Sequence, residues 1–139
     1  MNKKYLTVVI FDIDNFKEIS KAKSMEEVLR YLQRFYRYIG DQVIAGKGRI
    51  LDYQFDSVIV AFKKAKVALT TAEKIINEDK FKVKCSLATG YLYECSIGHP
   101  SFKRNGVFGE VINTGMRLLY NNPSSNITIC ETTRKLIAE

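Results

Sequence analysis

Apolar residues follow two different periods along this chain, and each period predicts one kind of secondary structure. Short, nearly continuous apolar runs predict buried strands at residues 5–12, 49–53, 57–62, 83–93, 102–108 and 127–130. Apolar residues at every third or fourth position over residues 25–43 predict a long amphipathic helix, which ends at Gly46. Similar spacing and start signals predict shorter helices at residues 16–22, 65–76, 110–120 and 131–138.

The predicted order of elements is β-α-α-β-β-α-β-β-α-β-α. The strands at 49–53 and 57–62 are close enough in sequence to form a hairpin, and Gly90 predicts a bulge within the strand at 83–93. This order is typical of an α+β fold, namely a ferredoxin-like, palm-type mixed β-sheet with helices packed on one face. No linker or repeat divides residues 1–139, so the sequence predicts a single domain.

The composition agrees with a small globular protein and bears on its cellular location. With 139 residues and 46% hydrophobic content, the chain is long enough for one domain with its own core. No apolar run approaches the ~20 residues that a membrane-spanning helix needs, and the first residues lack a secretory pattern. The three cysteines, Cys85, Cys95 and Cys130, have no metal-binding spacing, so we expect reduced thiols in a cytoplasmic protein.

The net charge of +7 is dispersed along the chain and is not gathered in one basic run. Basic residues do not alternate with aromatic ones as they do in proteins that stack single-stranded bases. We therefore expect no nucleic-acid partner. A basic surface also attracts small polyanions such as nucleoside triphosphates, so the charge is compatible with a nucleotide as substrate.

Two aspartates stand at the ends of apolar strands, because Asp12 closes the first strand and Asp56 directly precedes the third. A carboxylate in such a place costs free energy unless a cation meets it. If the two strands are neighbours, the pair suits Mg²⁺ or Mn²⁺ carrying a nucleoside triphosphate. Asn113 and Arg117 share one face of the helix at 110–120, where a hydrogen-bonding amide and a cation suit a phosphoryl-transfer transition state. These residues indicate nucleotide chemistry.

Five short segments carry motifs that occur in the same order in one enzyme family. Residues 11–16 (Phe-Asp-Ile-Asp-Asn-Phe) and residues 55–62 each contain an aspartate motif of the kind that binds metal. Residues 86–90 form a strand that ends in Thr-Gly. Residues 109–118 carry the Asn and Arg spaced four apart, and residues 127–133 carry the strand and helix start that follow. Together, over nearly the whole chain, these segments resemble the catalytic domain of class III nucleotidyl cyclases, the adenylate and guanylate cyclases.

This resemblance implies a phosphorus-oxygen lyase that converts a nucleoside triphosphate to a 3′,5′-cyclic monophosphate and pyrophosphate for signalling. It implies two Mg²⁺ or Mn²⁺ ions, held by Asp12 and Asp56 with help from the Ile13 carbonyl. It also implies that Asn113 orients the ribose and that Arg117 stabilises charge on the α-phosphate. In such enzymes the aspartates and the Asn/Arg pair come from opposite subunits, which implies a head-to-tail homodimer.

The resemblance also implies residues that hold the triphosphate. Backbone amides at a helix start would cradle phosphate oxygens, and these belong to Asp14, Asn15 and Phe16. The family usually has a terminal hairpin that supplies a triphosphate-binding lysine, and the present sequence ends at Glu139 before such a segment. We expect a basic residue elsewhere to substitute for that lysine, and the candidates are Lys17, Lys103 and Arg104.

The positions that select the base depart from the adenylate cyclase pattern. Those enzymes place Lys four residues before the second metal aspartate and Asp or Thr three residues before the glycine of the helix motif. The corresponding residues here are Asp52 and Gly106. A carboxylate at position 52 accepts hydrogen bonds from guanine or from a pyrimidine, as guanylate cyclases and the pyrimidine cyclases of antiviral phage defence suggest. Phe55 also replaces the usual glycine before the second metal aspartate.

Two other interpretations remain open at this stage. The segment 11–19 also resembles the opening of diguanylate cyclases and of the palm domain of CRISPR polymerases, which join two nucleotides. Residues 54–58 (Gln-Phe-Asp-Ser-Val) lack the Gly-Gly-Asp-Glu-Phe signature of diguanylate cyclases, and the helix with Asn113 and Arg117 fits the class III pattern better. The third interpretation is a catalytically silent, cyclase-like regulatory module, which the altered base positions favour and the retained metal aspartates oppose.

Overall fold

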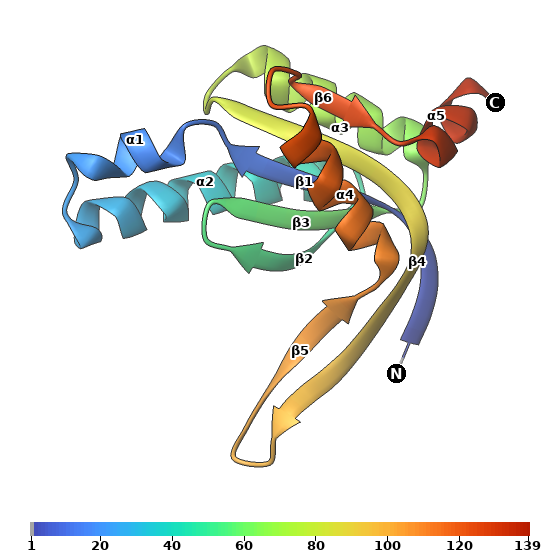
Figure 1. Ribbon diagram of the computed structural model, residues 1–139, viewed down its shortest axis with the longest axis horizontal. Coiled ribbons are helices and arrows are strands. Elements are labelled where there is room, and N and C mark those ends of the chain that lie inside the picture. Colours follow the sequence, from blue (N-terminus) through green and yellow to red (C-terminus); the bar gives the residue numbers. More distant parts are fainter. Residues whose placement is uncertain (1) are drawn as a thin grey trace.

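The computed structural model describes residues 2–139 and places six strands in one sheet (Figure 1). Five strands follow the order β2-β3-β1-β4-β5 with antiparallel pairing, and the sixth, β6, pairs with β4 in parallel. The sheet is therefore mixed, as the sequence predicts. The strands are β1 Asn2–Ile13, β2 Arg49–Gln54, β3 Ser57–Phe62, β4 Val83–His99, β5 Phe102–Phe108 and β6 Ile127–Ile129.

All the helices predicted from the sequence are present, in the predicted order: α1 Phe16–Lys21, α2 Met25–Ala45, α3 Ala65–Glu78, α4 Glu110–Asn121 and α5 Glu131–Ala138. The start of α2 has a strong local signal, because Ser24 and Glu27 form a capping box with reciprocal hydrogen bonds. Within residues 2–139 no helix is both long and apolar enough to cross a membrane.

The strand β4 is longer than its apolar pattern predicts. The sequence indicates an end near Tyr93, but β4 continues to His99 by pairing with β5, from Tyr93↔Phe108 to His99↔Phe102. The resulting hairpin projects away from the body of the sheet (Figure 1). Most of its side chains beyond Cys95 are exposed, which is why burial periodicity in the sequence could not reveal the extension.

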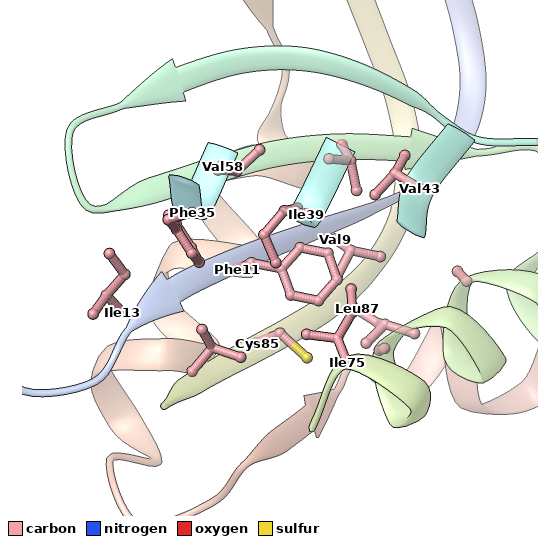
Figure 2. Close-up of a cluster of buried hydrophobic side chains, with 14 of the residues drawn as sticks. Val9, Phe11, Ile13, Phe35, Ile39, Val43, Val58, Ile75, Cys85 and Leu87 are labelled. Atoms are coloured by element: carbon pink, nitrogen blue, oxygen red, sulfur yellow. The ribbon is translucent and has the colours of Figure 1, made fainter. Parts of the chain in front are cut away.

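One face of the sheet packs against α2 and α3. Alternate residues of β1, namely Val9, Phe11 and Ile13, point into this layer (Figure 2). They meet apolar side chains of α2 and α3, among which Phe35 and Ile39 are fully buried. Burial of this kind contributes on the order of 25 cal/mol for each Å² of apolar surface, so this layer is the main hydrophobic core that fixes β1 in place.

The opposite face of the sheet is covered by α4, which differs from the expectation of helices on one face only. The intervening residues of β1, including Val8 and Ile10, pack with Val111 and Leu119 of α4. The α+β, ferredoxin-like arrangement is confirmed, but the one-sided layering holds only for α2 and α3. The physical reason is visible in β1, where consecutive apolar residues are buried on both sides, as is typical of a strand covered on both faces.

Gly90 does not form the predicted bulge. The pairing of β1 with β4 runs through Leu6↔Gly90 without a register shift, and the irregularity lies in β2, between Ile50 and Asp52. A Cβ at position 90 would lie 3.2 Å from the Cβ of Val111, the second residue of α4. The glycine therefore serves the close approach of α4 to the sheet.

Phe55 occupies a backbone conformation that normally favours glycine. It lies in the β2–β3 turn with φ of 57°, in the left-handed region. Its ring packs edge-on against Phe16 with 5.1 Å between centroids, and the Tyr36 hydroxyl donates to its carbonyl. These contacts hold the turn, which directly precedes Asp56, in place of the glycine that the resembled motif usually has.

Candidate active site

The structure brings Asp12 and Asp56 together, as the sequence predicts for neighbouring strands. Asp12 lies near the end of β1 and pairs with Ser57, the first residue of β3. The Ser57 hydroxyl donates to the Asp12 carboxylate at 2.8 Å, and the Ile13 amide donates to the Asp56 carbonyl at 2.9 Å. The antiparallel pairing of β1 with β3 therefore places the two carboxylates and Ile13 at one end of the sheet.

Burial makes the charge of Asp12 unfavourable in the absence of a cation. The pKa of this carboxyl lies above its ordinary value, chiefly because the group is partly removed from water. The hydrogen bond from Ser57 opposes this shift, whereas the nearby charge of Asp56 adds to it. A half-buried carboxylate beside a second one is the arrangement that a divalent cation relieves.

A pocket of about 370 Å³ opens at this carboxylate pair. Lys84, which pairs with Asp12 across β1 and β4, lies in its wall and lowers the pKa of the Asp12 carboxyl. One side of the pocket is formed by α4, through Met116, Leu119 and Tyr120. The pocket therefore combines two carboxylates, one cation and an apolar wall of a size that suits a small ligand.

Sequence reasoning missed Lys84 and Ser57 as members of this site. Both residues can be recognised as members of the site only when the pairing of β1 with β3 and β4 is known. Lys84 is a charged residue near the start of an otherwise apolar strand, and Ser57 is the residue that faces Asp12 in β3. Residues of neighbouring antiparallel strands lie side by side at the end of a sheet, and the sequence does not state which strands are neighbours.

The donor set at this end of the sheet fits Mg²⁺ or Mn²⁺ in a complex with a triphosphate. Hard divalent cations prefer carboxylate and carbonyl oxygens, and Asp12, Asp56 and Ile13 offer these groups. Among residues 2–139 no cluster of three or more His, Cys, Asp or Glu side chains is present. Phosphate oxygens of a bound substrate are a common source of further ligands where Mg²⁺ is held by only one or two carboxylates.

The loop after β1 only partly matches the expected phosphate cradle. The Asp14 amide donates to the Lys82 carbonyl at 2.8 Å, so this amide already has a protein partner. Asn15 has a left-handed backbone with φ of 55° and caps α1, while Phe16 is buried. Asn15 and Phe16 remain the candidates for the cradle, and Lys17 follows them as an exposed side chain.

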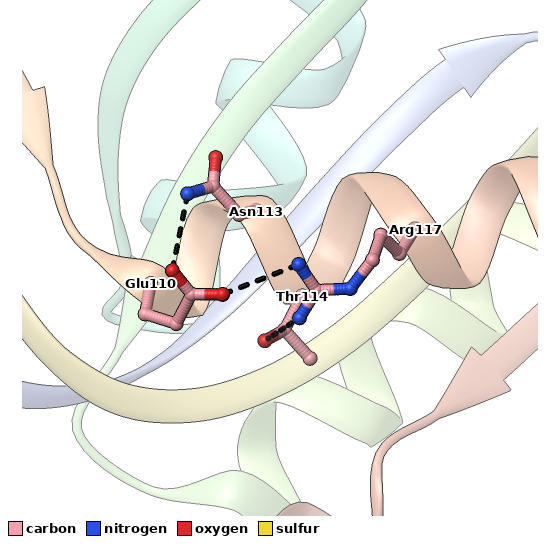
Figure 3. A network of polar contacts seen from close by, with 4 residues as sticks. All are labelled: Glu110, Asn113, Thr114 and Arg117. Carbon is pink, nitrogen blue, oxygen red and sulfur yellow. Dashed lines mark hydrogen bonds and ion pairs between the residues drawn. The ribbon is translucent and has the colours of Figure 1, made fainter.

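Asn113 and Arg117 do not enter the pocket of the same chain. Both side chains are exposed on α4, whereas the residues of α4 in the pocket wall are Met116, Leu119 and Tyr120. Their contacts are with their own helix, where both bond to the Glu110 carboxylate (Figure 3). The structure therefore keeps the pair on one helix face, as predicted, but separates it from the aspartates.

The candidate base-selecting residues lie on β2 and β5, the strands at the two ends of the strand order, which contact each other around one pocket. Asp52 is in β2, and its carboxylate accepts from the Tyr53 amide at 2.9 Å. Gly106 is in β5 and lines a second pocket of about 450 Å³ with Arg49 and Glu94, but Asp52 does not line it. A Cβ at position 106 would lie 2.7 Å from the ring of Phe108.

The basic residues expected to replace a terminal lysine also lie apart from the carboxylate pair. Lys103 and Arg104 are exposed in β5, on the hairpin that projects from the sheet (Figure 1). Lys17 is on α1, beside the loop that follows Asp12. Within one chain, the described structure places Lys84 in the pocket and none of the three expected residues in its wall.

Comparison with solved structures relates this fold to nucleotide cyclases. A bacterial light-regulated adenylyl cyclase matches with a TM-score of 0.87 at 18% identity, over 100% of this chain and 82% of that chain. The guanylate cyclase domain of RhGC from Catenaria anguillulae, solved in complex with GTP, matches with a TM-score of 0.86 at 18% identity, over 99% and 84% of the two chains. The adenylyl cyclase CyaB from P. aeruginosa matches with a TM-score of 0.77 at 21% identity, over 99% and 82%.

No family model matches the sequence, and no curated protein matches it. At identities of 18–21% the structural comparisons establish the fold. The chain has the fold of the catalytic domains of adenylyl and guanylyl cyclases.

Proposed function

We propose that this protein is a nucleotidyl cyclase, which converts a nucleoside triphosphate to a 3′,5′-cyclic monophosphate and pyrophosphate. The observation that carries the proposal is the Asp12–Asp56 carboxylate pair in a pocket that also contains Lys84, within a chain of cyclase fold. The elevated pKa of Asp12 supports it, because it means that negative charge on this carboxyl is unfavourable in the protein alone, and bound divalent cations would offset that charge.

In this proposal, Asp12 and Asp56 hold two Mg²⁺ or Mn²⁺ ions with the Ile13 carbonyl as a further ligand. Such ions, when bound, lower the pKa of the ribose 3′-hydroxyl and neutralise the triphosphate. The Lys84 ammonium adds a fixed positive charge beside the phosphates. The amides of Asn15 and Phe16, which start α1 next to the carboxylates, are available to phosphate oxygens.

The reaction is an internal displacement at the α-phosphorus. The 3′-oxygen forms a bond to this phosphorus, and the bond from the phosphorus to the bridging oxygen of the pyrophosphate breaks. The 3′-hydroxyl proton passes to solvent, and pyrophosphate leaves with its electron pair. Arg117 stabilises the charge that develops on the α-phosphate oxygens, and Asn113 holds the ribose so that the 3′-oxygen faces the phosphorus.

These two groups of residues would act together across a head-to-tail homodimer. Asn113 and Arg117 are exposed on α4 and outside the pocket of their own chain, which supports their use by a partner subunit. The projecting β4–β5 hairpin also exposes large apolar side chains, including Phe102, Ile97 and Phe108. Exposed apolar groups of this kind are typical of an interaction surface.

The choice of base depends in this proposal on Asp52, whose carboxylate accepts hydrogen bonds and so favours guanine or a pyrimidine. Replacing Asp52 with Lys should change the preferred nucleotide while leaving metal binding intact, and an unchanged preference would remove Asp52 from base recognition. We place the enzyme in the cytoplasm, where its substrates occur. A cyclic pyrimidine nucleotide as product would favour a role in antiviral defence.

The test is to incubate the purified protein with Mn²⁺ and, separately, with ATP, GTP, CTP and UTP, and to identify the products by mass spectrometry. Asp56→Asn is the matched control, because it keeps the size of the side chain and removes its charge. A cyclic mononucleotide that is absent with the control would support the proposal and identify the base.

Two other results would overturn it. A linked dinucleotide would assign the protein to the palm-type enzymes that join two nucleotides. Absence of any product, together with absence of Mn²⁺-dependent nucleotide binding in calorimetry, would indicate a catalytically silent regulatory module.

A further inference from the structure

The carboxylate of Glu110 connects the two proposed reaction groups of α4. One oxygen, Oε2, accepts from the Asn113 amide nitrogen at 3.3 Å, and the other, Oε1, accepts from Arg117 Nη1 at 3.2 Å (Figure 3). Arg117 Nη2 donates in addition to the Thr114 hydroxyl at 3.2 Å. A single side chain at the start of the helix therefore contacts both groups at once.

The helix itself explains why these side chains meet. Glu110 is the first residue of α4, and Asn113 and Arg117 follow it by about one and two turns. Side chains spaced in this way stack on one helix face. The Arg117 side chain is long and exposed, so it would sample many rotamers if no contact restrained it. Within residues 2–139, Glu110 is the acidic residue with which Arg117 forms an ion pair.

We propose that Glu110 is a positioning residue, which holds Asn113 and Arg117 in the orientation that the cyclisation reaction needs. This inference rests on the proposed function. The Asn113 nitrogen is directed toward Glu110, so its Oδ1 is the end that faces outward and can accept from a ribose hydroxyl (Figure 3). Arg117 uses N–H groups of both terminal nitrogens to bond Glu110 and Thr114 and retains others for a phosphate oxygen.

Glu110 also has a simpler possible role, which the experiment must separate from positioning. It lies in the first turn of α4, and the cap residue Gly109 has no side chain to bond the helix start. An acidic residue there stabilises a helix through its dipole. Glu131 has the same place in the first turn of α5 and is the matched control for that effect.

Two substitutions distinguish the roles. Glu110→Asp keeps the charge in the first turn, so a dipole role would survive, but its shorter side chain cannot reach both Asn113 and Arg117. Glu110→Gln keeps the length and removes the charge. If Glu110 positions the pair, both variants should lose about tenfold in kcat with little change in KM, because misplacement of a reacting group affects the transition state most. Glu131→Gln should leave kcat unchanged.

A second measurement does not depend on activity. In the wild-type protein, the nuclear magnetic resonance signals of the Arg117 terminal nitrogens should be separate at low temperature, because two hydrogen bonds restrict rotation of the guanidinium. They should merge in Glu110→Gln. The Arg117→Lys variant identifies which signals belong to Arg117.

The outcomes separate this inference from the proposed function. An active wild-type protein whose kcat is unchanged in Glu110→Asp and Glu110→Gln would overturn the positioning role and leave the cyclase proposal intact. Merged Arg117 signals in the wild-type protein would overturn it as well. An inactive wild-type protein would instead overturn the cyclase proposal, and the resonance measurement would still decide whether Glu110 holds Arg117.

Discussion

At the scale of single residues, the candidate site consists of groups that the fold holds at a cost to its own stability. Asp12 is half-buried, and its charged form is disfavoured by burial and by Asp56. Ser57 and Lys84 offset this only in part, since the pKa of Asp12 stays above its ordinary value. Groups kept in this way are characteristic of functional sites, where activity and stability oppose each other.

Replacing Asp12 with Asn should therefore change stability and activity in opposite directions. Without metal, the variant should have a higher unfolding temperature than the wild-type protein at pH 7.5, because a partly buried charge beside Asp56 is removed. Its Mn²⁺-dependent turnover should fall by about 100-fold or more, as is usual when a group that stabilises the transition state is lost. Calorimetry of the metal-free proteins and a turnover assay provide the test. A lower unfolding temperature for the variant would contradict this account of Asp12.

Two of the thiols, Cys85 and Cys130, should differ in reactivity because their surroundings differ. Burial raises the pKa of the Cys85 thiol to about 12. Burial acts on Cys130 in the same direction, but hydrogen bonds with Thr133, Thr89 and Thr132 together outweigh it and hold the pKa of that thiol below its ordinary value. With iodoacetamide at pH 8, Cys130 should be alkylated while Cys85 is untouched, as peptide mass spectrometry would reveal. In denaturant both thiols should react. Alkylation of Cys85 in the native protein as fast as that of Cys130 would contradict the burial of Cys85.

At the scale of elements, the position of α4 matters most for the site, and glycines determine it. Gly90 leaves room for Val111, and a Cβ at Gly115 would lie 2.8 Å from the Ile10 side chain. Gly109, just before the helix, passes close to the backbone of β4, since a Cβ there would lie 2.6 Å from the Tyr91 carbonyl oxygen. A backbone oxygen cannot move aside as the end of a flexible side chain can.

Gly109→Ala should consequently destabilise the protein by about 1–3 kcal/mol, the usual effect of forcing an extra methyl group into a packed site. Urea unfolding would measure this. Gly40→Ala in α2 is the control, because its nearest contact is the flexible end of Ile50 at 3.0 Å and alanine favours a helix by about 1 kcal/mol over glycine. Equal stability of Gly109→Ala and the wild-type protein would mean that α4 is not fixed by this contact.

At the scale of the whole molecule, the proposed reaction groups fall into two sets on different surfaces. Asp12, Asp56 and Lys84 line the pocket, while Asn113 and Arg117 are exposed outside it. A single chain thus presents two halves of a site that do not meet. A symmetric pair of chains contains each half twice, so two complete sites can form between subunits.

Mixed dimers should restore activity when each parent variant lacks a different half. Asp56→Asn and Arg117→Ala should each be inactive alone. Co-expressed in equal amounts, about half of the dimers should be mixed, each with one intact site of two, which gives about a quarter of wild-type activity. The turnover assay of co-purified protein is the measurement. Activity that stays at background, with mixed dimers verified by mass spectrometry, would place the whole reaction within one chain.

The sequence by itself determined the kinds and order of the elements, the place of Asp12 and Asp56 at strand ends and the shared helix face of Asn113 and Arg117. These follow from neighbours along the chain, since helix and strand periods and turn signals are local. Only the tertiary structure decided that α4 covers the second face, that Gly90 admits Val111, that Lys84 and Ser57 join the aspartates, and that Asn113 and Arg117 lie apart from them. Those outcomes depend on strand pairing and helix packing, in which many distant contacts act together and no single segment carries the information.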